Sequence, residues 1–294
     1  MKIIIGGSLG NIGRPLTQTL VKAGHNVTVI SSQAERKSEI EALGAKAAIG
    51  VVNDADFLAR TFSGGDAVFA MTPPNLGGSN VIANTVNAGE AYASAIQKAG
   101  IKRVVMLSSI GAHLPSGNGP IAGIHRIEKI YEQLPHVSVT FLRAGYFYNN
   151  FFHDIPMIRN AGIEGSNFAA TTRMPLVDPE DIARTAAEEL IKLTTGKNVR
   201  YIVSDIRTGA EIAEALGSAI DKPGLPWITF SDDQARDGMM GAGVPEEIAV
   251  LYTEMGAGFR TGTLVEDYER NGAPVTGSIK LNEFAKRFAS TYGA

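Results

Sequence analysis

Three glycines follow directly on the first apolar run of the chain. Residues 5–14 read IGGSLGNIGR, so that Gly7, Gly10 and Gly13 stand three residues apart. Glycine in a helix interior is less stable than alanine by about 1 kcal/mol, yet an amphipathic stretch begins here. The spacing predicts a turn from strand to helix with bare backbone. Two explanations are open: a tight turn alone, or a turn that a ligand approaches closely.

Short apolar runs alternate with amphipathic stretches over the first 145 residues. Apolar runs without polar alternation are typical of parallel strands covered on both faces, and strand–helix repeats favour a doubly wound sheet. The expected strands are residues 3–5, 27–30, 47–52, 67–71, 104–107, 137–142 and 199–203. The main expected helices are residues 15–23, 56–61, 80–99, 122–134, 245–255 and 281–291. Asp178 and Thr208 are predicted N-caps of two further helices.

These patterns predict an α/β fold, a doubly wound and mostly parallel Rossmann sheet with a small C-terminal substrate lobe. Residues 1–150, completed by about 177–204, are expected to form the dinucleotide-binding domain. Residues 151–176 and 205–294 are expected to form the smaller substrate-binding lobe, since their apolar pattern is less regular.

Composition excludes several classes of function. The 294 residues carry a formal net charge of -3 and contain no cysteine, and the five histidines are scattered. Nucleic acid is therefore not an expected partner, and no metal site is predicted. The N-terminal run at 3–5 is too short for a signal peptide, and no apolar run reaches about 18 residues. A cytoplasmic protein without a membrane partner is expected.

The strand and helix around the glycines make the motif informative. A dinucleotide pyrophosphate binds where a helix N-terminus presents free N–H groups, and glycine lets the backbone approach it. The second strand ends in Ser31 and Ser32, where an NAD-selective site usually has Asp or Glu. With Arg36 and Lys37 nearby, this end favours the 2′-phosphate of NADP over NAD. Alternatively, Arg36 and Lys37 are a solvated helix start.

Two further loops follow strands whose carboxyl ends meet the same sheet edge. Asn53 and Asp54 are predicted neighbours of the adenine. Met71, Thr72 and Pro73 are predicted to form a wall beside a ribose or ring. Plain turns are the alternative for both.

Four segments together resemble the NmrA-like group of atypical short-chain dehydrogenase/reductases. They are IGGSLGNIG at the N-terminus, LSSIGA at 107–112, FLRAGYFYNN at 141–150 and PLVDPEDIARTAAEEL at 175–190, and the resemblance spans about 1–220. It implies cofactor contacts at Gly7, Leu9, Gly10, Asn11 and Ile12. It also implies that Ser108, Ser109, Tyr146 and Phe147 lie near the nicotinamide. The group includes quinone and triphenylmethane-dye reductases, and regulators that bind the dinucleotide without turnover.

The proton donor is not obvious from the sequence. Tyr-x-x-x-Lys, the pair of the best-known branches of that superfamily, is absent after the fifth strand, and His125 and Lys129 stand at its spacing instead. The register of related members, which carry a glutamate where Glu128 stands, argues against a catalytic role for both. His125 and Tyr146 remain the candidate catalytic residues, with pocket lining or solvent exposure as the alternative for His125.

Reduction of a quinone-like acceptor needs little acid–base help, because proximity to the nicotinamide does most of the work. The aromatic segment around Tyr146 predicts a flat apolar wall, or equally core packing. We therefore expect an NADPH-dependent oxidoreductase that acts on a small aromatic or quinone-like substrate, as a monomer or homodimer. A dinucleotide-sensing regulator is the main rival, and a carbonyl reductase a third possibility.

Overall fold

The computed structural model describes residues 1–73 and 79–294, and the contacts within it divide the chain into two compact units. The first unit comprises Met1–Ser109, Gly123–Arg143 and Ile182–Arg200. The second comprises Ile110–Ala122, Ala144–Asp181 and Tyr201–Ala294. Residues 110–122 and 144–150, which the sequence placed in the dinucleotide domain, thus cluster with the second unit.

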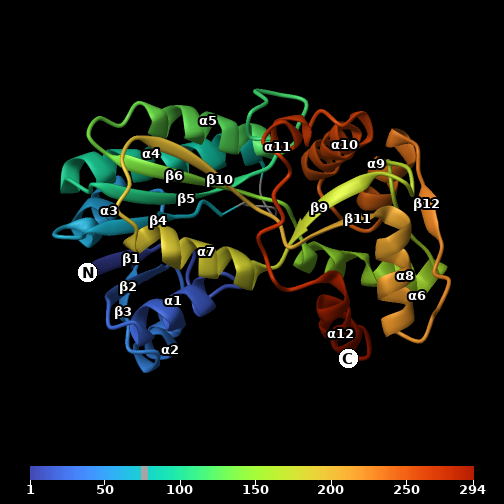
Figure 1. Ribbon diagram of the computed structural model, residues 1–294, viewed down its shortest axis with the longest axis horizontal. Helices are drawn as coiled ribbons and strands as arrows, with labels where there is room; N and C mark the ends of the chain where they lie inside the picture. Colours follow the sequence, from blue (N-terminus) through green and yellow to red (C-terminus); the bar gives the residue numbers. More distant parts are fainter. Residues whose placement is uncertain (74–78) are drawn as a thin grey trace. The chain divides into compact units, whose positions relative to one another are not determined.

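The first unit is built on a seven-stranded sheet with the order β10-β6-β5-β4-β1-β2-β3 (Figure 1). The pairs β1–β2, β2–β3, β1–β4 and β4–β5 are parallel. The strands are β1 (Lys2–Ile5), β2 (Asn26–Ser31), β3 (Lys46–Ile49), β4 (Ala67–Ala70), β5 (Arg103–Ser109), β6 (Ser138–Ala144) and β10 (Lys197–Ile202). The reversal of strand order beside β1 is the topological switch point at which such sheets bind ligands. The predicted doubly wound α/β fold is confirmed.

Helices cover both faces of this sheet. They are α1 (Gly13–Lys22), α2 (Lys37–Ala42), α3 (Ala55–Phe62), α4 (Val81–Ala99), α5 (Ile121–Glu132) and α7 (Pro179–Ile191), with a 3₁₀ turn η1 at Ala34–Arg36. Figure 1 shows α3, α4 and α5 along one face and α1 along the other. The core on the first of these faces joins Phe62, Tyr92 and Tyr131 to the sheet residues Val68 and Val104.

Glycines end two helices of the first unit. Gly24 and Gly100 follow α1 and α4 in the left-handed conformation, with φ of 81° and 69°. The expected strand at 47–52, however, is wrong in its second half. After Ile49 the Gly50 N–H still donates to the Ser31 carbonyl at 2.9 Å. The chain then turns toward Asp54, whose carboxylate caps α3, so that Val51 and Val52 form a loop.

The second unit contains shorter elements. A three-stranded sheet has the order β11-β9-β7 and a two-stranded sheet pairs β12 with β8. The strands are β7 (Tyr146–Phe147), β8 (Glu164–Ser166), β9 (Arg173–Val177), β11 (Asp205–Thr208) and β12 (Trp227–Thr229). The helices are η2 (Tyr148–Asp154), α6 (Ile155–Ala161), α8 (Gly209–Ala219), α9 (Asp232–Gly241), α10 (Glu246–Thr261), α11 (Glu266–Arg270) and α12 (Leu281–Tyr292). The predicted capping box of Thr208 and Glu211 opens α8.

Asp178 and Asp181 anchor the C-terminal segment of this unit, and both are fully buried. Asp178 accepts a hydrogen bond from the Glu180 N–H, as an N-cap does, and pairs with Arg287. The Asp181 carboxylate accepts from the Ser204 hydroxyl at 2.6 Å and from the Ile279 N–H at 3.1 Å. The segment DPEDIA is therefore both a helix start and an anchor.

Candidate functional site

The glycine loop is hydrogen-bonded to two strands of the first unit, β2 and β4. The Gly6 N–H donates to the Phe69 carbonyl of β4, and the Ser8 N–H donates to the Ile30 carbonyl of β2, each at 3.0 Å. The Ser8 hydroxyl also donates to the Ser31 hydroxyl at 3.0 Å. Ser8 itself has a left-handed backbone, with φ of 55°. The loop is therefore held in one conformation before any ligand arrives.

The three glycines have different reasons to be glycine. Gly7 has a φ of +89°, and a Cβ on it would lie 1.9 Å from the Met71 Cε. A Cβ on Gly13 would lie 1.9 Å from the Ser8 carbonyl oxygen, so the turn itself needs both residues bare. A Cβ on Gly10 would meet only the Gly7 oxygen, at 3.5 Å, which is an ordinary contact. The fold therefore does not explain Gly10.

Gly10 instead borders a cavity of about 620 Å³. The cavity lies at the carboxyl ends of β1, β2, β3 and β4, beside the first turn of α1. Its lining residues are Gly7, Ser8, Leu9, Gly10, Ile30, Ser31, Ser32, Gln33, Arg36, Gly50, Val51, Val52, Asn53, Met71, Pro73 and Asn84. Among these lining residues, all from the part of the chain that the structure describes, Arg36 carries a charge and none is a carboxylate. The cavity therefore favours an anionic ligand.

Nine of the residues predicted to bind the cofactor line this cavity, and the others lie outside its lining. Asn11 is exposed, and Ile12 and Gly13 are buried in the start of α1. Lys37 is exposed at the start of α2, and the Asp54 carboxylate accepts from the Asp56 and Phe57 N–H groups as the N-cap of α3. Thr72 is half-buried and follows Met71 in the chain.

Sequence reasoning did not single out Ser8, Gln33, Asn84 or the loop 50–52. The loop was hidden because its valines extended the apolar run of β3, and Gly50 was the available signal of the strand's end. Val51 is 55% exposed, which leaves an unusual apolar side chain at the cavity.

The Ser108 hydroxyl, predicted near the nicotinamide, is engaged inside the first unit. It donates to Glu128 Oε1 of α5 at 2.5 Å. Arg143 of β6 binds the same carboxylate through Nε at 3.1 Å and Nη2 at 2.6 Å. Glu128 is 1% exposed, so this triad is a buried ion pair completed by a hydroxyl. It holds β5, α5 and β6 together.

The other predicted residues of the first unit near this triad have different surroundings. Ser109 and His125 are half-buried. Lys129 is exposed and pairs with Glu132 at 3.0 Å, as a surface helix pair does. The prediction of a catalytic His125 stays a prediction.

Tyr146 and Phe147 belong to the second unit and begin its aromatic cluster. The Tyr146 ring lies 5.5 Å from the Phe151 ring and 6.3 Å from the Phe259 ring, measured between centroids. Phe259 in turn packs against Phe168 at 5.9 Å. Burial raises the pKa of Tyr146 well above its ordinary value, so its hydroxyl keeps its proton at neutral pH.

The comparison with known families fits this geometry. The sequence profile of the NmrA-like family matches residues 1–228, more than half of the chain. The chain belongs to the NmrA-like family. The match runs through the whole first unit and into the second, and it includes all four segments that carry the resemblance.

Individual proteins similar to this NmrA-like chain include three reductases. The NAD(P)H azoreductase of Xenophilus azovorans is 27% identical over 302 residues and is covered completely, as is this chain. An NADPH-dependent quinone oxidoreductase of Escherichia coli, solved with NADPH, has a TM-score of 0.83 and 18% identity, with 97% of this chain and 99% of that one covered. The triphenylmethane reductase of Citrobacter sp., solved with NADP(H), has a TM-score of 0.79 and 20% identity, with the same coverage. At these identities the two structures show the shared fold.

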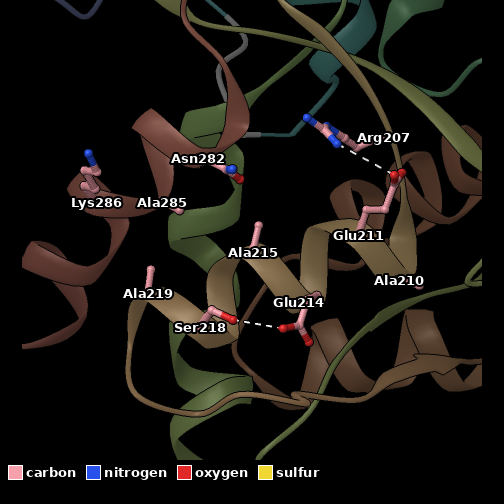
Figure 2. Close-up of a pocket in the computed structure, with 10 residues that line it drawn as sticks. All are labelled: Arg207, Ala210, Glu211, Glu214, Ala215, Ser218, Ala219, Asn282, Ala285 and Lys286. Atoms are coloured by element: carbon pink, nitrogen blue, oxygen red, sulfur yellow. Dashed lines mark hydrogen bonds and ion pairs between the residues drawn. The ribbon is translucent and has the colours of Figure 1, made fainter.

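A second cavity, of about 680 Å³, lies in the second unit between α8 and α12 (Figure 2). Alanines at 210, 215, 219 and 285 line it, with polar residues around them. Arg207, Glu211, Glu214 and Ser218 already bind neighbouring residues. Glu214 accepts from the Ser218 hydroxyl at 2.9 Å, and Glu211 accepts from Thr208 and lies 3.7 Å from the Arg207 guanidinium. We therefore interpret this groove as helix packing with small side chains.

In residues 1–73 and 79–294 no group of three or more His, Asp or Glu side chains is placed to hold a metal ion. None of the helices that those residues form combines the length and apolar character needed to span a bilayer.

Proposed function

We propose that this NmrA-like protein is an NAD(P)H-dependent oxidoreductase that transfers hydride to a quinone-like or other flat conjugated acceptor, with NADPH preferred over NADH. The observation that carries the proposal is the cavity over the glycine loop, with Gly10 bare although the fold tolerates a Cβ there. The azoreductase relative and the fold shared with quinone and dye reductases support the reaction class.

The loop and α1 would bind the pyrophosphate. The first N–H groups of a helix have no intrahelical acceptor and attract anions. Gly7, Leu9 and Gly10 border the cavity there, so bare backbone faces the phosphates. Asn11, Ile12 and Gly13 follow directly and supply the start of the helix.

The other end of the cavity would hold the adenosine and its 2′-phosphate. Ser32 and Arg36 offer a hydroxyl and a guanidinium, and such donors bind a phosphate more strongly than a ribose hydroxyl. The Ser31 hydroxyl, which also lines the cavity, instead donates to the Gln33 carbonyl and accepts from the Ser8 hydroxyl. Asn53 and the exposed Val51 would border the adenine. Met71 and Pro73 would form the wall beside a ribose.

When bound, the nicotinamide supplies the hydride. The chain's part is to hold the ring and acceptor in contact, which is itself a large rate effect. The Ser108 hydroxyl and Glu128 are consumed in the buried triad with Arg143, so we do not assign them a proton transfer. Acceptors that take hydride without a strong acid, and recover a proton from water, suit such a site. The aromatic cluster around Tyr146 would supply a flat apolar surface for them.

The test is NADPH oxidation followed at the nicotinamide absorbance band with quinones, azo dyes and triphenylmethane dyes. We expect turnover with at least one class, and faster turnover with NADPH than with NADH. Binding of NADPH without oxidation by any acceptor would instead support the second candidate, a dinucleotide-sensing regulator. That candidate is favoured by one observation, the hydrogen bond from the Ser108 hydroxyl to Glu128, which keeps this hydroxyl from donating to a substrate.

A further inference from the structure

Two arginines converge on one carboxylate at the rim of the glycine-loop cavity. Arg36 of η1 donates from Nη1 to Glu39 Oε2 of α2 at 2.7 Å. Arg14 of α1 donates from Nη2 to the other oxygen, Oε1. The Arg36 Nε also donates to the Gln33 side chain at 3.3 Å. The guanidinium that borders the cavity is therefore already held by a carboxylate.

Each of the three side chains is roughly two-fifths exposed, at 38% for Arg14 and Glu39 and 41% for Arg36. Water and an incoming ligand can therefore reach the cluster. The hydrogen bonds from Arg36 and Arg14 lower the pKa of Glu39, which keeps it ionised at neutral pH. Two positive charges and one negative charge thus stand beside the place where the adenosine ribose would lie.

A 2′-phosphate and the Glu39 carboxylate would compete for hydrogen bonds from the Arg36 and Arg14 guanidinium groups. The phosphate carries more charge and three acceptor oxygens, so it can displace the carboxylate. The displaced carboxylate would remain near it as a like charge and oppose binding. The 2′-hydroxyl of NADH does not compete in this way. It can donate a hydrogen bond to the Glu39 carboxylate while that carboxylate still accepts from the arginines.

We propose that Glu39 sets the selectivity between NADPH and NADH by competing with the 2′-phosphate for Arg36 and Arg14. This inference rests on the proposed dinucleotide site and concerns a positioning residue that acts through the two arginines. An ordinary surface ion pair contributes little and would not distinguish the two dinucleotides. The distinction between the dinucleotides is therefore what must be measured.

The experiment compares the dissociation constants of NADPH and NADH for the full chain, Glu39→Gln and Glu41→Gln. Glu41 is exposed and lies two residues after Glu39 on the same helix. Its variant therefore removes an equal charge from the same helix. We expect Glu39→Gln to tighten NADPH binding about 3- to 10-fold and to leave NADH within twofold, and Glu41→Gln to change neither by more than twofold. The dissociation constant of adenosine 2′-monophosphate should change among the variants as that of NADPH does. The dissociation constant of adenosine 5′-monophosphate should change as that of NADH does. The gain should shrink in 0.5 M salt, because screening weakens exposed charge interactions.

Equal changes for NADPH and NADH would overturn the inference, and so would weaker NADPH binding, which would make Glu39 an aligning partner of the arginines instead. In both cases the dinucleotide site itself would stand. If the unmodified chain binds neither dinucleotide, the proposed function fails as well, which separates the two failures.

Discussion

Two cavities of nearly equal volume, about 620 Å³ at the glycine loop and about 680 Å³ between α8 and α12, differ in what their polar groups already bind. In the α8–α12 groove, Glu211 and Glu214 accept from neighbours on their own helix and its cap. At the glycine loop, Gly10 borders the cavity, and a Cβ there would meet only an ordinary contact. Volume alone therefore does not identify a site. A glycine that borders the cavity although the fold does not require it is the better indicator.

The largest expected effect is that of a substitution in the glycine loop, and it tests whether this cavity binds the dinucleotide. Gly10→Val should weaken NADPH binding by at least 100-fold, about 2.7 kcal/mol, because the branched side chain would occupy the place of the pyrophosphate. The melting temperature should hardly change, since a Cβ at Gly10 meets only an ordinary contact at 3.5 Å. Isothermal titration and thermal melts measure the two quantities.

The matched control for Gly10→Val is Gly238→Val, since a Cβ on Gly238 of α9 meets nothing within 4 Å. It should leave NADPH affinity unchanged. Affinity within threefold of the parent for a well-folded Gly10→Val would mean that no phosphate lies on the loop.

The second prediction separates the two cations that the sequence treated alike. Arg36 borders the cavity, whereas Lys37 is exposed outside its lining. Arg36→Ala should weaken NADPH binding about 10-fold or more, as expected for loss of a charge-assisted hydrogen bond, and NADH binding less than threefold. Lys37→Ala should change neither by more than twofold. Equal losses for both dinucleotides with Arg36→Ala would contradict the 2′-phosphate assignment.

Patterns of the first unit made its fold and most of its cavity predictable. Strands such as β2 and β4 are apolar on both faces, and the glycine spacing has a backbone cause, so local sequence carries the information. The loop at Val51 could not be predicted, because its apolar run continues that of β3. Likewise, the engagement of Ser108 by Glu128 and Arg143 depends on three elements that are far apart in the chain.

The second unit was less predictable for a physical reason. Its strands β7 and β12 have two and three residues, too few to show a period of two. Its stability rests on long-range polar anchors such as Asp181 with Ser204, and local pattern does not reveal such partners. By contrast, the helix starts at Asp178 and Thr208 were predictable, because caps act within a few residues.

A third prediction concerns the polar pair of the second unit that the fold leaves poorly satisfied. Glu164 is 1% exposed, and its carboxyl group shares a hydrogen bond with Asp154. Its Oε2 atom has no hydrogen-bond partner among the described residues. Burial raises the pKa of Asp154 to about 7 and also raises the pKa of Glu164, where the Asp154 charge adds to the effect. The folded chain therefore holds a proton that the unfolded chain has released by about pH 5.

The raised pKa of Asp154 determines how the stability of the folded chain changes with pH. The contribution to folding is complete below the unfolded pKa near 4 and is lost as the pH rises through about 7. From pH 5.5 to pH 8 the melting temperature of the parent should fall about 3–6 °C more than that of Asp154→Asn, for a change of about 1 kcal/mol or more. Asp233→Asn, on the exposed face of α9, is the control and should follow the parent. Parallel curves for the parent and Asp154→Asn would refute a shared proton.

The smallest effect tests the groove side of the comparison. Thr208 accepts from the Glu211 N–H, and the Glu211 carboxylate accepts from the Thr208 N–H at 2.7 Å, which satisfies two donors at the start of α8. Thr208→Ala should therefore lower stability by about 1 kcal/mol, or about 2–4 °C in melting temperature. NADPH affinity should stay within twofold of the parent, because the groove's polar groups serve the helix. Thr208→Ser keeps the hydroxyl and should restore most of the loss. A change in NADPH affinity or turnover larger than the change in stability would instead assign the groove to the reaction, and the contrast between the two cavities would then have to be drawn differently.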